Sequence, residues 1–359
     1  MSNSKNTDRS VDLLLQKLSQ VNGNALLVAD ENWHQTNWLS VADAATGDIK
    51  LLSNRFDIAR SAAAAGIPSH FNDFDFSEFA PNDFDVIAFR ISKERASSHH
   101  VINQAAWLLK PEGQLMLSGE KNEGIKTYVK QACTRLGDKA STEKYGLNYF
   151  ASIRSCDAST SELDDKNYSQ LRPIDVPYQM ATDRQYVSKP GIFGWDKIDR
   201  GSAFLIEHLP QFLTRYDKTP KSLLDLGCGY GYLSCEASRY PFTSITGTDN
   251  NAAALAATKE NFAHLPHPHY QVIAADAGDQ LDQAFDTILC NPPFHQGFTV
   301  DDEMNIKFLF NSKRLLSSSG QALFVVNAFI PLEHAATQYF AQANVLANNG
   351  AFKLVALSQ

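Results

Sequence analysis

An asparagine followed by two prolines and a phenylalanine, Asn291, Pro292, Pro293 and Phe294, is the run of residues with the clearest chemical use. It follows an apolar strand-like segment, and the prolines must end that strand because proline cannot donate a ladder hydrogen bond. The Asn291 side-chain oxygen and the Pro292 carbonyl could then accept hydrogen bonds from an amino group and turn its nitrogen lone pair outward. Phe294 offers a face on which a base could stack. We therefore predict that these four residues are catalytic.

A glycine-rich loop, DLGCGYG, runs from Asp225 to Gly231, where another apolar strand-like run ends and a helix begins. Glycines let the backbone turn sharply and approach a ligand closely, and a dinucleotide-binding fold is one explanation for them. Two features favour S-adenosylmethionine instead. The helix opens without the third glycine of the dinucleotide fingerprint, and Asp225 suits a ligand that carries an ammonium group. We therefore predict S-adenosylmethionine as the cofactor and Asp225, Gly227, Cys228 and Gly229 as residues that bind it.

Two more acidic residues end the next two strand-like runs, Asp249 after SITGT and Asp276 after YQVIAA. The Asp249 carboxylate could accept hydrogen bonds from both hydroxyls of a ribose, and Asp276 could accept one from an adenine amino group. A competing explanation is that Asp276 caps the helix that follows. Because open parallel sheets bind ligands at the carboxyl edge of their strands, we expect Asp249, Asp276 and Asn291 to border one cofactor site.

Strand-like and helix-like segments alternate through the second half of the chain. Apolar strand-like runs cover 222–227, 244–249, 270–276, 285–291 and 321–327, and helical spacing covers 252–265 and 305–316. This alternation predicts an α/β domain, in which a doubly wound parallel sheet carries helices on both faces. Each motif described above then follows a strand of that sheet.

The first half of the chain repeats this plan, which predicts an internal duplication. The matched segments are 25–30 with 222–227, 84–87 plus Arg90 with 285–288 plus Asn291, and 108–114 with 315–321. In the first copy DENW at 30–33 replaces the glycine loop and RISK at 90–93 replaces Asn-Pro-Pro-Phe, so we expect that copy to be degenerate. We predict two tandem Rossmann-like domains, 1–155 and 185–359, joined by a polar linker at 156–184.

Composition limits the partners and the compartment. A net charge of −8 over 359 residues argues against indiscriminate coating of nucleic acid, which depends on many phosphate contacts, but not against a selective RNA enzyme. Residues 90–144 carry more basic than acidic side chains and are the best candidate for a basic face. The sequence has no membrane-spanning apolar run and no secretory pattern, so we expect a cytoplasmic protein. Five scattered cysteines without a CxxC pair, and histidines without HExxH, predict no metal site.

These motifs resemble those of the class I methyltransferases that act on amino nitrogens. More narrowly, the chain is similar to the bacterial ribosomal RNA guanine 2-amino methyltransferases that carry a tandem pair of methyltransferase-like domains. The matching segments are DLGCGYG at 225–231, NPPFHQG at 291–297, VVNAFIP at 325–331 and PGIFGWDKIDRGS at 190–202. In the last segment Phe193, Asp199 and Gly201 match the family pattern, whereas Gly194 and Trp195 depart from it. The resemblance implies that this stretch lies beside the cofactor and that Phe193 contacts it.

The resemblance also implies a reaction: methylation of the exocyclic 2-amino group of a guanine in ribosomal RNA, with the small-subunit type favoured by the PGIF segment. The partner would be ribosomal RNA within a ribosomal subunit or an assembly intermediate, and the first domain would help RNA binding or folding. Other interpretations stay open. They are a large-subunit guanine, an adenine or a protein glutamine as acceptor, or a non-catalytic RNA-binding assembly module, and a dehydrogenase is the least favoured.

Overall fold

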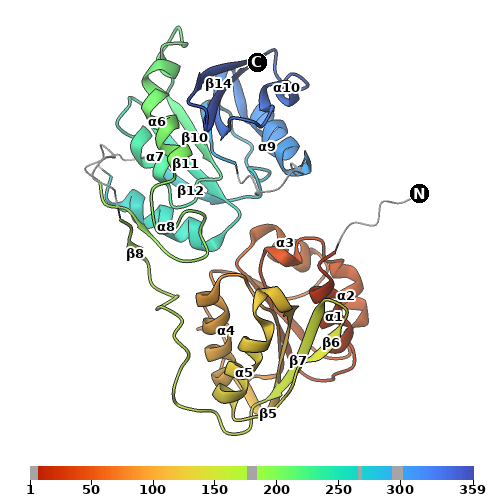
Figure 1. Ribbon diagram of the computed structural model, residues 1–359. Helices are drawn as coiled ribbons and strands as arrows, with labels where there is room; N and C mark the ends of the chain where they lie inside the picture. Colours follow the sequence, from red (N-terminus) through yellow and green to blue (C-terminus); the bar gives the residue numbers. More distant parts are fainter. Residues whose placement is uncertain (1–6, 176–183, 266–268, 293–301) are drawn as a thin grey trace. The chain divides into compact units, whose positions relative to one another are not determined.

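The computed structural model describes residues 7–175, 184–265, 269–292 and 302–359. The chain forms two compact units, Met1–Gln170 and Leu171–Gln359, each with its own sheet (Figure 1). The boundary between the units lies inside the predicted linker, 156–184. No helix among the described residues is long and apolar enough to cross a membrane.

Unit 1 is a seven-stranded sheet between two layers of helices, in the spatial order β3-β2-β1-β4-β5-β7-β6. The strands are β1 (Ala25–Ala29), β2 (Ile49–Ser53), β3 (Ser69–Phe71), β4 (Phe84–Arg90), β5 (Leu109–Glu120), β6 (Glu143–Tyr145) and β7 (Asn148–Arg154). The helices are α1 (Arg9–Leu18), α2 (Trp38–Ala44), α3 (Phe56–Ala64), α4 (Arg95–Leu108) and α5 (Ile125–Leu136), with the 3₁₀ turns η1 (Glu31–Trp33) and η2 (Lys121–Glu123). The first five strands are parallel, and β7 runs antiparallel to both of its neighbours.

The central strand of unit 1 is buried on both faces, which explains its uninterrupted apolar sequence. Leu26 and Val28 pack into the core under α4 and α5, whereas Leu27 packs into the core under α1, α2 and α3. Figure 1 shows these two groups of helices on opposite sides of the sheet. Because side chains alternate along a strand, both helix layers fix the register of β1.

The first part of the predicted linker packs on unit 1. Tyr168 is buried in the core under α4, and its hydroxyl donates to Asp73 at 2.8 Å. The backbone of Leu163 exchanges two hydrogen bonds with the side chain of Asn103 on α4, at 2.8 and 2.9 Å. A polar stretch therefore follows the surface of unit 1 before the chain enters unit 2.

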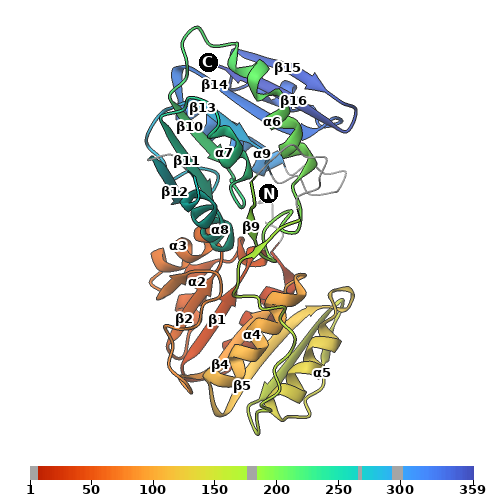
Figure 2. The ribbon, with the colours of Figure 1, turned by 90° about the vertical axis from the view of Figure 1, so that its left-hand side faces the viewer.

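Unit 2 repeats the architecture, with strand order β12-β11-β10-β13-β14-β16-β15 (Figure 2). Its strands are β10 (Ser222–Leu226), β11 (Ser244–Asp249), β12 (Tyr270–Ala274), β13 (Phe285–Cys290), β14 (Leu316–Asn327), β15 (Gln342–Asn348) and β16 (Phe352–Ser358). Its helices are α6 (Arg200–Leu213), α7 (Tyr232–Ala237), α8 (Ala252–Ala263), α9 (Asp302–Leu315) and α10 (Leu332–Ala336), and β8 (Arg172–Pro173) and β9 (Val187–Ser188) form a separate two-stranded sheet. Leu223 faces the core under α6, α7 and α8, and Leu224 faces the core under α9 and α10.

The two sheets share even an irregularity, which confirms the predicted duplication and fold class. In unit 1 the β4–β5 pairing steps from Phe84 with Leu109 to Val86 with Gln114. In unit 2 the β13–β14 pairing steps from Phe285 with Leu316 to Thr287 with Gln321, so the same number of residues is skipped on the second strand. A shared fold with a shared bulge at the same place is expected of two copies of one ancestral domain.

Candidate active site

The carboxyl ends of parallel strands meet at one edge of the unit 2 sheet. Leu226 at the end of β10 pairs with Thr248 of β11 on one side and with Cys290 of β13 on the other. The glycine loop, Asp249 and Asn291 come next along these three strands. The register therefore brings them to the same edge.

The glycine loop adopts backbone conformations that favour glycine. The angle φ is 79° at Gly227, 56° at Gly229 and 84° at Gly231. The N–H of Gly227 donates to the Thr248 carbonyl at 2.9 Å, which turns the chain back over β11. A Cβ at position 231 would lie 3.1 Å from the Thr258 side chain, whereas one at position 229 would meet nothing nearer than 4.0 Å. The loop is therefore closely packed on its helix side and open at Gly229.

Asp249 fastens this loop to the end of β11. Its Oδ2 accepts the N–H of Gly229 at 2.9 Å, and its Oδ1 accepts the N–H of Asn251 at 2.8 Å. Cys228 lies underneath, buried, with Sγ 3.4 Å from the Thr258 hydroxyl, and burial raises the pKa of its thiol well above the usual range. Asp249 and the Gly229 backbone thus form one partly exposed surface.

Asp225 lies behind the glycine loop and is fully buried. Its Oδ2 accepts hydrogen bonds from the backbone N–H of Ser234 at 3.0 Å and from the Ser234 hydroxyl at 2.6 Å. Burial raises the pKa of this carboxyl to about 7. The side chain therefore ties β10 to α7 and is not exposed at the edge of the sheet.

Asp276 lies in the turn after β12. Its carboxylate forms an ion pair with Lys307 of α9, and its N–H donates to Asp279 at 3.1 Å. A turn and not a helix follows Asp276, so the alternative that it caps a helix was wrong. Lys307 had no signal in the sequence, because a single lysine on a helix looks like ordinary surface charge.

The segment that precedes α6 is attached to the same edge through asparagine side chains. Asn251 Nδ2 donates to the Gly191 carbonyl at 2.8 Å, and Asn261 Nδ2 donates to the Val187 carbonyl at 3.0 Å. Phe193 lies in this segment with its side chain exposed, at 73% of the possible surface. No sequence motif marks either asparagine, since Asn251 has the pattern of an ordinary helix cap and Asn261 that of a polar residue within a helix.

Asn291 follows β13 and contacts the beginning of α6. Its side-chain Nδ2 lies 2.8 Å from Asp199 Oδ2 and 2.8 Å from the Ser202 hydroxyl oxygen. Both hydrogens of the Asn291 amide group therefore take part in hydrogen bonds to these two residues. Two other predicted catalytic residues, Pro293 and Phe294, lie outside the described residues.

The corresponding edge of unit 1 holds a buried ion-pair network. Arg90, which matches Asn291 in the repeat, is 4% exposed and pairs with Asp8 at 3.0 Å and with Glu123 at 2.8 Å. Burial alone would lower the pKa of Arg90, but its bonds with the two carboxylates raise it overall. Asp30, at the start of the segment that replaces the glycine loop, caps η1 and is buried, which raises its pKa to about 7.

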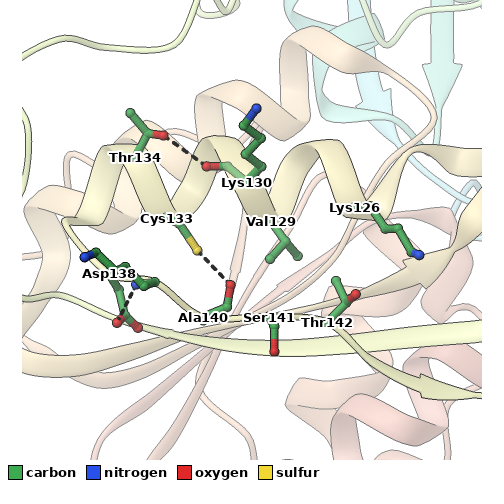
Figure 3. A pocket seen from close by; sticks show the side chains of 10 residues that line it. Lys126, Val129, Lys130, Cys133, Thr134, Asp138, Ala140, Ser141 and Thr142 are labelled. Atoms are coloured by element: carbon green, nitrogen blue, oxygen red, sulfur yellow. Dashed lines mark hydrogen bonds between the residues drawn. The ribbon is translucent and has the colours of Figure 1, made fainter.

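A groove of about 390 Å³ lies on unit 1 between α5 and the segment that follows it (Figure 3). Lys126 and Lys130 on α5 and Lys139 across from them line it. The carboxylate of Asp138, also in the lining, accepts backbone N–H groups of Arg154 and Lys139, at 2.8 Å each, and these bonds lower its pKa. Within the described part of the chain, no three His, Cys, Asp or Glu side chains gather as a metal site would require.

The family models and the relatives that match this chain cover both of its units. The Methyltransferase small domain model matches residues 183–356, and the Methyltransferase small domain N-terminal model matches residues 12–142. Ribosomal RNA small subunit methyltransferase C of Shewanella pealeana is 29% identical over 295 residues, which are 81% of this chain and 82% of the relative. The protein of the same name from Pseudomonas paraeruginosa is 30% identical over 271 residues, covering 74% of this chain and 76% of the relative.

The two-unit fold is also found in a solved structure. It is the T. thermophilus 16S rRNA N2 methyltransferase in complex with AdoMet and guanosine, with a TM-score of 0.81 and 22% sequence identity. The superposition covers 98% of this chain and 92% of that chain. The likeness in structure therefore includes both sheets.

Replacing Arg90 by alanine should destabilise unit 1 strongly. We expect the free energy of unfolding to fall by about 3–5 kcal/mol, because the Glu123 side chain, 8% exposed, would keep a charge without its partner. Arg154→Ala is the control, since the Arg154 side chain is 56% exposed and its longer ion pairs with Glu112 and Asp138, at 3.3 and 3.8 Å, should contribute less than about 1 kcal/mol. Urea denaturation measures the free energy of unfolding of both variants. An equal loss in the two would contradict the stabilising role assigned to the buried Arg90 network.

Proposed function

The chain belongs to the ribosomal RNA small subunit methyltransferase C family, and from this premise we propose that it methylates the 2-amino group of a guanine in small-subunit ribosomal RNA. The observation that carries the proposal is Asn291 at the carboxyl edge of the sheet, beside the glycine loop, with its amide nitrogen already hydrogen-bonded. That arrangement leaves a carbonyl oxygen to receive an amino group. A ribosomal RNA substrate also implies that the protein acts in the bacterial cytoplasm.

The residues around the glycine loop fit S-adenosylmethionine, which supplies a methyl group activated by the positive charge on its sulfur. The backbone at Gly229 is open to close approach, and Asp249 lies beside it, partly exposed. We propose that Gly227, Gly229 and Asp249 contact the cofactor. Asp225 and Cys228 are buried, so their contribution is to hold the loop from behind.

Two further residues border the same site in this proposal. The exposed ring of Phe193 is available to pack on the cofactor, because the segment that carries it is tied to the end of β11. Asp276 at the end of β12 would accept a hydrogen bond from the adenine amino group. Its carboxylate also forms an ion pair with Lys307 of α9.

Catalysis in this proposal is mainly positioning. The Asn291 and Pro292 carbonyls accept the hydrogens of the amino group and hold its lone pair toward the methyl donor, while Phe294 stacks on the base. Cys290 is fully buried and burial raises the pKa of its thiol well above the usual range, which argues against a covalent cysteine mechanism. A guanine amino group inside a duplex cannot reach such a site, so the base must be unpaired or flipped out.

Unit 1 in this proposal supports RNA binding. The groove beside α5 presents three lysines, and the negative charge of Asp138 within it is already bonded to backbone N–H groups. Lysines bind phosphate as point charges, without sequence preference. The natural substrate in this view is ribosomal RNA within a subunit or an assembly intermediate.

The decisive experiment uses radiolabelled methyl donor with small subunits, large subunits and free RNA from a strain that lacks the gene. We expect labelled 2-methylguanosine in the small subunit or its RNA. Asn291→Ala should abolish the label while the Kd for S-adenosylmethionine stays unchanged, because the substitution removes the acceptor for the amino group and two hydrogen bonds to the start of α6. Label in adenosine or in protein would show that this group, and not guanine, is the methyl acceptor. Full turnover by Asn291→Ala would show that Asn291 is not catalytic.

Asp249→Ala should raise the Kd for S-adenosylmethionine by about 10–100-fold, which corresponds to one or two lost hydrogen bonds to a charged group. Isothermal titration calorimetry measures this change. Asp282→Ala is the matched control, since Asp282 is an exposed acid in the turn before β13, at the opposite edge of the sheet. If both variants bound the cofactor like the wild type, Asp249 would not be a cofactor residue.

The double variant Lys126→Glu with Lys130→Glu should weaken RNA binding and make it less dependent on salt. Each lost phosphate contact should reduce the slope of log K against log salt by about 0.7–0.9. Filter binding at several salt concentrations gives that slope. Lys218→Glu is the control, because Lys218 is an exposed lysine of unit 2 and the substitution makes the same kind of charge change, and it should leave the slope unchanged. An unaltered slope in the double variant would exclude the groove as an RNA-binding surface.

A further inference from the structure

The carboxylate that caps α6 is also a partner of Asn291. Asp199 Oδ2 accepts the N–H of Ser202 at 2.8 Å and the amide Nδ2 of Asn291 at 2.8 Å. The second hydrogen of that amide goes to the Ser202 hydroxyl oxygen, also at 2.8 Å. Two residues at the start of α6 therefore hold the side chain of a residue about ninety positions later in the chain.

This contact permits only one orientation of the Asn291 amide. An ionised carboxylate accepts hydrogen bonds and cannot donate them. If the amide turned over, its oxygen would face Asp199 Oδ2, and two acceptors would repel each other. The orientation with nitrogen toward α6 and oxygen away from it is thus the stable one, and no described residue donates to that oxygen.

We propose that Asp199 is a positioning residue that orients Asn291 for methyl transfer. This inference rests on the function proposed above, in which the Asn291 oxygen receives the amino group. The negative charge of Asp199 also polarises the amide through the hydrogen bond, so the Asn291 oxygen becomes a better acceptor. The effect grows as positive charge develops on the attacking nitrogen.

The first unit contains the same contact in a different chemical form. Asp8 caps α1, where its Oδ1 accepts the N–H of Ser10 at 2.8 Å, and its Oδ2 pairs with Arg90 at 3.0 Å. The contact between a helix-capping aspartate and a residue at the end of the fourth strand therefore belongs to both copies. In unit 1 it can only hold the helix to the sheet, so a purely structural role is the competing explanation for unit 2.

Two substitutions at position 199 separate these explanations. In Asp199→Ser the helix cap is kept, because serine caps helices as well as aspartate, but its shorter side chain withdraws the acceptor from Asn291. In Asp199→Asn one oxygen keeps both the cap and the contact with Asn291, since Oδ2 alone accepts both groups in the wild type, and only the negative charge is lost.

We expect Asp199→Ser to lower kcat by about 100-fold with little change in Tm or in the Kd for S-adenosylmethionine. Asp199→Asn should stay within about tenfold of the wild type, because it keeps the contact with Asn291. Asp282→Ser is the matched control, because Asp282 is an exposed acid before β13 and undergoes the same substitution, and the kcat of this variant should be unchanged. Ser202→Ala removes one of the two acceptors and should lower kcat by a few fold.

Two results would overturn the proposal. One is wild-type kcat in Asp199→Ser, and the other is an Asp199→Asn variant that is no more active than Asp199→Ser. A parallel loss of Tm, cofactor binding and kcat would assign Asp199 a structural role. If the wild type itself made no 2-methylguanosine, the proposed function would fail. The ¹⁵N signal of the Asn291 amide would still test the contact, since Asp199→Ser should shift it and Asp282→Ser should not.

Discussion

The parallel pairing of β10 with β11 on one side and β13 on the other is the constraint on which the site depends. It makes three strands end at the same level, so Asp249 and Asn291 lie on either side of the start of the glycine loop. The register is held by apolar side chains, since Leu223 and Leu224 face opposite cores. A slip by one residue would exchange those faces, which the packing on both sides forbids. The polar site is therefore placed by the hydrophobic core beneath it.

A second layer of polar contacts adds the segment before α6 to this edge. Side-chain amides make most of these links, with Asn251 bonded to Gly191, Asn261 bonded to Val187, and Asn291 bonded to Asp199. An amide can donate and accept, so it can join a backbone carbonyl to another element without a buried charge. The same links stiffen the surroundings of Phe193, whose ring is exposed.

The two copies show how one architecture serves stability in one place and chemistry in another. Arg90 satisfies two carboxylates and is almost completely buried. Asn291 in the matching position is held by a similar aspartate but keeps an oxygen that no described residue uses. In the proposed function, the exchange of a buried, paired cation for an amide with an unused oxygen turns a structural contact into a place where a ligand can bind.

Sequence alone determined the fold class, the duplication and the strand ends where the motifs lie, because alternating apolar runs and glycine or proline breaks are local patterns. It also indicated Asn291, the glycine loop and Asp249 as neighbours through the rule for parallel sheets. Only the tertiary structure decided which acids are exposed, placing Asp225 inside the fold and Asp249 at the edge. It alone brought Asp199 to Asn291 and Lys307 to Asp276. Such contacts join residues far apart in the chain, and hydrophobic packing between elements sets them, so no local pattern carries their signal.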